Sequence, residues 1–134
     1  MSSIKLDIVT PERTVYSKEI NMVVAKAKTG ELGIMPGHAP ILATLQAGVM
    51  RIRVNDSNQD LVAVSGGFLE VSEEQITVLA RTAELQGEID VERAKEAKER
   101  AEGRLKDNSE NVDHARAKAA LDRAMARLKT TNFK

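Results

Sequence analysis

The feature of the sequence that most restricts its fold is a change of composition after Gly87. All three prolines and seven of the eight glycines lie at or before this residue, where they separate short apolar runs. Ile4, Leu6 and Ile8 alternate with polar or charged residues, which is the period-two pattern of a strand with one buried face. After Gly87 the chain has nine alanines, one glycine and no proline, a composition that favours helix. We therefore expect two parts with different secondary structure.

Residues 1–88 are predicted to form a β-rich domain. Further apolar or alternating runs indicate strands at Met22–Ala27, Ile41–Leu45, Arg51–Val54, Leu61–Val64, Phe68–Val71 and Gln75–Ala80. Turn-forming segments such as Asn55–Asn58 and Ser65–Gly67 separate them. About eight to ten short strands in such a length are typical of a two-layer β-sandwich or a flattened barrel. The predicted fold class is α+β, with this sandwich placed first.

Residues 89–134 are predicted to form an antiparallel two-helix hairpin. Asp90 is a suitable N-cap for a helix that runs to about Leu105, and the second helix extends from about Asn111 to Leu128 after a break at 106–109. One face of each helix carries alanine and leucine, at Ala94, Ala97, Ala101 and Leu105 and at Ala117, Leu121, Ala124 and Leu128. Burial stabilises a protein by about 0.8 kcal/mol per CH₂ group. Because alanine has fewer side-chain carbons than leucine, this seam is weaker than one made of leucine. The hairpin could open easily, or the alanines could simply permit close packing.

Composition and charge exclude several classes of function. The chain has no cysteine, no apolar run of the roughly 20 residues that cross a bilayer, and an N-terminus unlike a secretory signal. Aromatic residues make up 2% of the chain, which leaves almost no platforms for stacking bases. Residues 1–88 hold eight Lys/Arg against eleven Asp/Glu, and residues 89–134 hold twelve against nine. We expect no nucleic-acid ligand and no direct membrane span, and different partners for the two parts.

The most specific motif is the segment Gly30–Pro40, which reads Gly-Glu-Leu-Gly-Ile-Met-Pro-Gly-His-Ala-Pro and is followed by Leu45 and Gly48. It is joined in order by Thr10–Arg13, Val64–Val71, Thr77–Ala80 and Ile89–Ala94. These five ordered blocks, together with the change from strands to a helical hairpin, resemble the epsilon subunit of rotary F-type ATP synthases. The resemblance covers nearly the whole chain.

That resemblance implies a non-catalytic rotor subunit that couples proton-driven rotation to ATP synthesis. Residues 1–88 would bind the foot of the gamma stalk and sit on the c-ring. Residues 89–134 would form a mobile hairpin that folds against the sandwich or extends among the catalytic beta and alpha subunits, where it inhibits ATP hydrolysis. No cofactor is required by this role, and ATP is an optional regulatory ligand.

The resemblance also implies a peripheral membrane protein on the cytoplasmic or stromal face. Thr10–Val15 and Arg51–Asn55 are most similar to the cyanobacterial and plastid forms, which would place the chain on a thylakoid membrane. Otherwise the plasma membrane is expected.

No catalytic or metal site is predicted from the residues themselves. The chain has two histidines and no cysteine, whereas a zinc site normally uses three or four protein ligands. No nucleophile with a paired base and no glycine-rich phosphate loop of the Walker type is present. The pair Gly66 and Gly67 favours a turn or bulge over a ligand cradle. The chain is therefore not expected to be an enzyme.

The Ile89–Ala94 block matches the motif with which some bacterial epsilon subunits bind ATP. Together with arginines on the two helices it gives the candidate ATP-binding residues Glu84, Ile89, Asp90, Arg93, Ala94, Arg100, Arg123 and Arg127. Arginine suits phosphate because its planar fork donates two hydrogen bonds at once, and a carboxylate can orient that arginine. The alternative is that Asp90 is only a helix cap and that the arginines are solvated.

The candidate partner-interface residues are Glu31, His38, Arg116, Lys118, Arg123 and Arg127. Glu31 lies in the Gly30–Gly33 segment, which is expected to form a turn. Through the resemblance, Glu31 would approach the polar loops of the c-ring and the His38 turn would approach gamma. From Val112 onward the two aspartates are outnumbered by six basic residues, Lys134 included, and the family offers an acidic segment of beta as their partner. Solvated charges are the alternative in each case.

Two other classes of function remain open at this point. The chain could be a free-standing ATP-sensing binding module whose hairpin closes on nucleotide, in which case it would not co-purify with gamma. It could also be an enzyme with a dispersed site, which would require turnover by the isolated chain.

Overall fold

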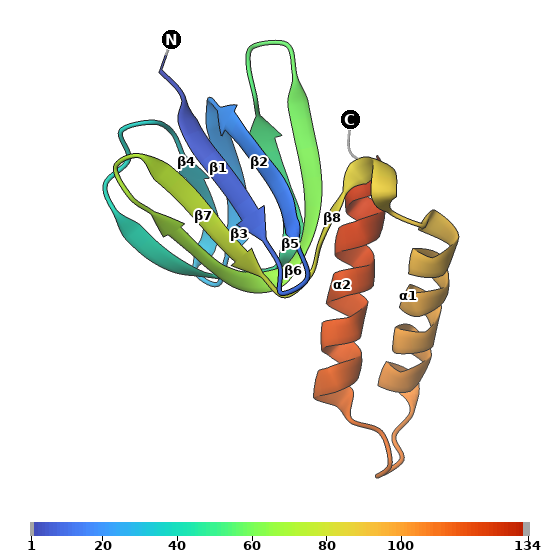
Figure 1. Ribbon diagram of the computed structural model, residues 1–134. Helices are drawn as coiled ribbons and strands as arrows, with labels where there is room; N and C mark the ends of the chain where they lie inside the picture. Colours follow the sequence, from blue (N-terminus) through green and yellow to red (C-terminus); the bar gives the residue numbers. More distant parts are fainter. Residues whose placement is uncertain (1, 133–134) are drawn as a thin grey trace.

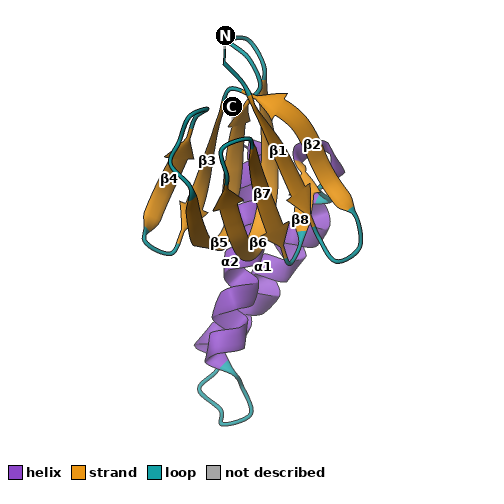
Figure 2. Cartoon of the chain, turned by 60° about the vertical axis from the view of Figure 1, so that its left-hand side comes forward, coloured by secondary structure: helices purple, strands orange, loops and turns teal. Residues whose placement is uncertain are grey.

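Eight strands form one hydrogen-bonded sheet that folds over into two layers in the computed structural model, which describes residues 2–132 (Figures 1 and 2). The strands are β1 (Ile4–Val9), β2 (Thr14–Ile20), β3 (Met22–Ala27), β4 (Gly30–Ile34), β5 (Ile41–Arg53), β6 (Gln59–Val71), β7 (Gln75–Ala80) and β8 (Ala83–Leu85). Their order is β2-β1-β7-β6-β5-β3-β4, and β8 pairs with β6. The β1–β7 pair is parallel and every other pair is antiparallel. The predicted β-sandwich followed by two helices is confirmed.

Two of the strands are longer than the sequence predicted. Ile41–Leu45 and Arg51–Val54 belong to the single strand β5, and Leu61–Val64 and Phe68–Val71 belong to β6. The prediction that residues 65–67 form a separating turn is wrong, because they lie within β6. Gly66 and Gly67 have φ angles of 113° and 135°, which let the strand bend without ending.

This bend lets one strand serve two neighbours. Before it, Val64 of β6 pairs with Ala83 of β8, and after it Gly67 pairs with Ala80 of β7. Gly67 has no room for a side chain, since a Cβ atom there would lie 2.0 Å from the Leu79 carbonyl oxygen. The glycine pair is therefore a structural feature of the sheet.

The segment that begins the Gly30–Pro40 motif is a strand, where the sequence was interpreted as a turn. Glu31 and Leu32 lie in β4, which pairs with β3 from Gly30 opposite Ala27 to Ile34 opposite Val23. Ile34 is fully buried and anchors the strand. Two further strands escaped prediction: β2 lacks regular alternation, and β8 has only three residues.

The core of the sandwich consists of aliphatic side chains from every strand. The largest fully buried ones are Leu6, Ile8, Ile20, Ile34, Met50, Ile52, Leu69 and Ile76. No hairpin residue belongs to this cluster among the described residues. The sandwich therefore has a hydrophobic core of its own.

A polar cluster joins the edge strand β2 to β6. The Tyr16 hydroxyl donates to Asp60 at 2.7 Å, and the Lys18 ammonium lies 3.0 Å from the same carboxylate. Burial alone would raise the pKa of Asp60, but the hydrogen bonds from Tyr16 and Lys18 outweigh it and hold this pKa below its ordinary value. Because the folded-state pKa is lowered, the stabilisation is present near neutral pH and is lost as the pH falls through that pKa.

The hairpin consists of α1 (Val91–Lys106) and α2 (His114–Asn132), with the short 3₁₀ helix η1 (Gln86–Glu88) leading into it. Asp90 caps α1 as predicted, accepting a hydrogen bond from the Arg93 amide at 3.1 Å. The second helix begins later than expected because Asp113 accepts from the Arg116 amide at 3.0 Å and so acts as its cap. It also ends later, at Asn132.

The predicted alanine seam joins the two helices. Ala94, Ala101, Ala117 and Ala124 are buried, while Ala97, Leu105, Leu121 and Leu128 are partly buried. The helix α2 also lies against β5 and β6 of the sandwich (Figure 1). Leu61 and Ala63 alternate along β6 with the core residues Val62 and Val64, so they face outward, yet they are buried. The hairpin is what covers this outer face of the sheet.

Replacing Gly67 by alanine should destabilise the chain strongly, by roughly 2–4 kcal/mol, because the new methyl group would collide with backbone atoms and the φ angle is unfavourable for alanine. Urea unfolding followed by circular dichroism measures the change. The matched control is Gly103→Ala within α1, where nothing lies within 4 Å, and where helix propensity should raise stability by about 0.5–1 kcal/mol. Equal effects of the two substitutions would contradict this account of the bend.

Candidate functional site

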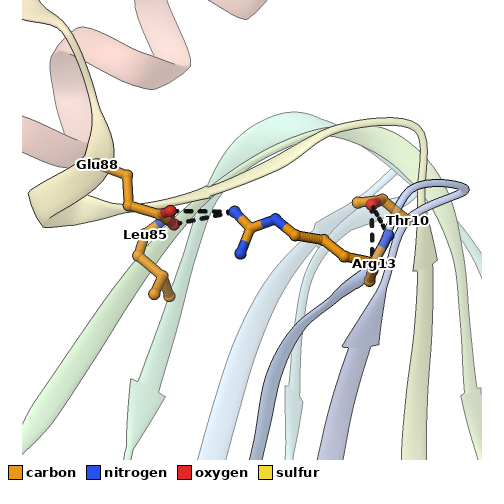
Figure 3. A network of polar contacts seen from close by, with 4 residues as sticks. All are labelled: Thr10, Arg13, Leu85 and Glu88. Atoms are coloured by element: carbon orange, nitrogen blue, oxygen red, sulfur yellow. Dashed lines mark hydrogen bonds and ion pairs between the residues drawn. The ribbon is translucent and has the colours of Figure 1, made fainter.

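The junction between sandwich and hairpin is held by the Glu88 carboxylate. It accepts a hydrogen bond from the Leu85 amide at 3.2 Å and from the Arg13 guanidinium at 3.0 and 3.3 Å (Figure 3). Arg13 lies in the β1–β2 turn, where its own amide donates to the Thr10 hydroxyl at 3.3 Å. The Thr10–Arg13 block therefore fixes the start of the linker that leads to the hairpin.

A second contact joins β8 to α2. The Arg127 guanidinium forms an ion pair with Glu84, and the two side chains are 29% and 31% exposed. Close by, the Gln86 side chain donates to the Thr130 carbonyl at 3.0 Å. Glu84 stands opposite Ala63 in the register of β6 and β8, on the face that α2 covers. These polar contacts hold α2 on the sandwich at the end nearest the C-terminus.

The candidate ATP-binding residues are only partly brought together. Glu84 and Arg127 contact each other, and Asp90 contacts the Arg93 backbone, so all four already have intramolecular roles. Ile89 and Ala94 are buried, whereas the Arg93 and Arg100 side chains are exposed. Arg123 lines a groove between α2 and the sandwich.

A groove of about 1040 Å³ separates part of α2 from the sandwich. Its walls carry seven basic residues, which are Lys26, Lys28, Arg51, Arg81, Lys118, Arg123 and Lys129. Two carboxylates, Glu31 and Asp122, also line it. We call this space the basic groove. The sequence does not predict this groove, because the alternation at Lys26 and Lys28 indicates outward-facing side chains but not that they lie opposite α2.

The candidate interface residues do not gather in one place. Glu31 is exposed at the rim of the basic groove and pairs with Arg51 at 3.2 Å, and Lys118 pairs with Asp122 at 2.7 Å. Arg116 is exposed near the start of α2. His38 lies in the β4–β5 turn, where its amide donates to the Met35 carbonyl at 3.1 Å. The positive charge that Lys134 was expected to add lies outside the described residues.

Three large apolar side chains are exposed on one face of β5, β6 and β7. Leu42, Phe68 and Leu79 are 71%, 53% and 56% exposed. Phe68 is opposite Leu79 in the β6–β7 register, and Leu42 is opposite Glu70, which lies on the same face of β6 as Phe68. We call these three residues the apolar patch. Exposed apolar groups that cluster in this way mark an interaction surface more often than single ones do.

Within residues 2–132, no three His, Asp or Glu side chains are grouped so that they could hold a metal ion. None of the described helices is both long enough and apolar enough to cross a bilayer.

Comparison with known proteins identifies the family. Residues 3–86 match the beta-sandwich domain of the ATP synthase delta/epsilon chain, and residues 88–132 match the long alpha-helix domain of the same chain. The chain belongs to the ATP synthase delta/epsilon family. The epsilon chain is a non-catalytic subunit of the ATP synthase complex.

The relatives agree with this assignment. The ATP synthase epsilon chain of Brevibacillus brevis is 51% identical over 78% of this chain and 80% of its own length. That of Alkalihalophilus pseudofirmus is 48% identical over 84% of both. Among solved structures, a chain of the Euglena gracilis mitochondrial ATP synthase superposes with a TM-score of 0.82 at 21% identity, covering 94% of this chain and 79% of that one. A chain in a structure of the Tetrahymena thermophila mitochondrial ATP synthase central stalk and c-ring superposes with a TM-score of 0.63 at 18% sequence identity, covering 98% of both chains. These two likenesses show a shared fold.

The ion pair between Glu84 and Arg127 should contribute measurably to the docking of the hairpin. In a double-mutant cycle with Glu84→Gln and Arg127→Gln, we expect a coupling free energy of about 1 kcal/mol, since both side chains are partly shielded from water. Urea unfolding of the four chains measures it. A cycle on the exposed pair Lys95 and Glu92, whose closest atoms are 3.9 Å apart, should give a coupling near zero. The same value for both pairs would mean that Glu84 and Arg127 do not hold the hairpin.

Proposed function

We propose that this chain is a central-stalk rotor subunit of a proton-translocating F-type ATP synthase. It couples rotation to ATP synthesis and restrains ATP hydrolysis through its C-terminal hairpin. The observation that carries the proposal is the two-part structure of a family member: a sandwich with its own core, and a hairpin docked on it through a small apolar area and a few polar contacts. A hairpin held in this way can detach while the sandwich stays folded.

The sandwich would supply the fixed attachment to the rotor. The apolar patch offers Leu42, Phe68 and Leu79 to the gamma subunit, and the neighbouring His38 turn would extend that contact. Glu31, at the exposed edge strand β4, would face polar loops of the c-ring. The neighbours from Euglena and Tetrahymena come from assemblies described as F1 with c-ring and as central stalk with c-ring, which supports these two partners.

The detached hairpin would act on the catalytic subunits. On α2, the side chains of Arg116, Lys118, Arg123 and Arg127 would be available to acidic segments of beta and alpha once the helix leaves the sandwich. In the docked state Arg127 is occupied by Glu84 and Lys118 by Asp122. Extension therefore exchanges the Arg127–Glu84 ion pair for an intermolecular one, whereas Lys118 and Asp122 both lie on α2 and stay paired in either state. This exchange keeps the difference in free energy between the two states small.

ATP would be a regulator of this exchange and not a substrate. Bound between the start of α1 and the arginines of α2, it would favour the docked hairpin. The phosphates would have to compete with Glu84 for Arg127, and Asp90 would have to remain the cap of α1. The second candidate function, a free-standing ATP-sensing module, uses the same residues and differs in lacking a complex with gamma.

The proposed location is the membrane face at which the rotor turns, with the chain held there by its partners. The relatives described above are bacterial, and we favour the bacterial plasma membrane. The thylakoid membrane stays a prediction from the resemblance to cyanobacterial and plastid forms, to which these relatives add no support.

Deleting residues 89–134 from the assembled complex should raise ATP hydrolysis severalfold and leave ATP synthesis possible, because the hairpin obstructs rotation and the sandwich keeps its own core. Hydrolysis by the purified complex and synthesis in vesicles are the measurements. Unchanged hydrolysis after the deletion would remove the inhibitory role.

The truncated chain should still bind gamma. In the full chain, Phe68→Ser should weaken binding to gamma by about 2 kcal/mol, and Met125→Ser on α2 is the matched control.

Charge and hydrogen-bond geometry can be separated at Arg123 and Arg127. Replacing both by lysine keeps the charge but removes the bidentate fork, so the chain should lose ATP affinity and keep most of its inhibition of hydrolysis. Replacing both by alanine should abolish ATP-induced docking and also weaken inhibition. Calorimetry on the isolated chain and hydrolysis assays on the complex measure the two effects. If the native chain binds no ATP at millimolar concentration, ATP regulation fails and inhibition by charge alone remains.

A further inference from the structure

The basic groove contains positive charge that no carboxylate within residues 2–132 neutralises. Its two carboxylates are already paired, Glu31 with Arg51 and Asp122 with Lys118. Five basic residues remain, and among the described residues no side-chain hydrogen bond or ion pair engages them: Lys26, Lys28, Arg81, Arg123 and Lys129.

These charges come from both walls of the groove. Lys26 and Lys28 belong to β3 and the turn after it, and Arg81 follows β7, whereas Arg123 and Lys129 lie on α2. Like charges on facing walls repel one another and so oppose the docked position of α2. A recess lined by charge of one sign also concentrates counter-ions. An anion between the walls would turn this repulsion into attraction and hold the hairpin on the sandwich.

We propose that the basic groove binds a phosphate-rich anion of the tripolyphosphate type, at a site separate from the residues considered for ATP. Of those residues only Arg123 lines the groove; Glu84, Asp90, Arg93, Arg100 and Arg127 do not. The proposal therefore does not rest on ATP regulation or on the assembly with gamma.

The chemistry of the groove favours phosphate over carboxylate. A chain of phosphates carries several charges in a short length, which matches five unneutralised cations in one recess. Arg81 and Arg123 can each donate two hydrogen bonds to one phosphate, and the lysines act as point charges around it. The volume of about 1040 Å³ lies at the upper end of ligand pockets and leaves room for bridging water. The wall near Arg81 includes Gly66 and Gly67, so no side chain from the bend of β6 fills the space.

Calorimetric titration of the full chain with sodium tripolyphosphate at low ionic strength tests the proposal. We expect saturable binding of one anion per chain, weakened about tenfold by Lys26→Gln on the sandwich wall and by Lys129→Gln on the helix wall, since each removes a charged donor. Lys5→Gln on β1 and Lys95→Gln on α1 remove the same charge away from the groove and should leave the affinity unchanged. Arg100→Gln should also leave it unchanged, because Arg100 is a candidate ATP residue that neither lines the groove nor forms a described ion pair that docks the hairpin, and this result separates the two sites.

A second measurement asks whether the anion joins the two walls. Hydrogen exchange of the α2 amides should slow when tripolyphosphate is added. At the same subsaturating concentration it should slow less in Lys26→Gln, whose substitution is on the sandwich and not on the helix. Flotation with phosphatidylglycerol vesicles, if it occurs and is lost in the same two variants, identifies a lipid headgroup as the source of phosphate. Its absence identifies a soluble phosphate compound.

Three results would overturn the proposal. The first is the absence of saturable binding at millimolar tripolyphosphate. The second is an equal loss of affinity in the groove variants and in the Lys5 and Lys95 controls, which would reflect net charge alone. The third is equal or tighter binding of citrate or of an oligoglutamate peptide, which would show that the groove recognises carboxylates, as on an acidic protein segment.

Discussion

The docking of α2 on the outer face of β6 is the interaction on which the other features of the molecule depend. It buries Leu61 and Ala63, which would otherwise be exposed, and it brings Arg127 to Glu84 and Thr130 to Gln86. The basic groove exists only because the same helix lies beside the sheet. The contact uses small side chains and gains little from burial compared with the sandwich core. The sandwich, by contrast, keeps a hydrophobic core to which no described hairpin residue contributes.

The candidate functional residues of the junction are already engaged within the chain. Asp90 caps α1, Glu84 neutralises Arg127, and Glu88 holds both Arg13 and the Leu85 amide. Any ligand or partner that uses these groups must therefore compete with an intramolecular bond. In the proposed exchange between docked and extended states, competition of this kind would weaken each interaction and make the balance sensitive to modest changes in concentration.

Local patterns in the sequence predicted the elements whose causes are local. Alternation located β1 and β7, an apolar run located β3, and the position of Asp90 located the start of α1. The bend at Gly66 and Gly67 was misinterpreted because glycine pairs mark turns and strand bends alike, and the difference depends on β7 and β8. The helix α2 begins later than the sequence predicted because the Asp113 side chain caps it. The basic groove and the apolar patch could not be predicted, since each depends on register and docking between segments far apart in the chain.

The parallel pairing of β1 with β7 has a consequence for the order in which the chain folds. Leu6 of β1 lies opposite Ile76 of β7. The first strand can therefore pair with β7 only after most of the sandwich has been synthesised. Pairings of such long sequence separation form slowly, whereas contacts between adjacent helices form fast. The Arg13–Glu88 ion pair likewise joins the β1–β2 turn to the segment after β8, so it needs both segments in place. The last strands of the sandwich are thus needed to complete the pairing of its first strand, and the two helices follow them in the chain.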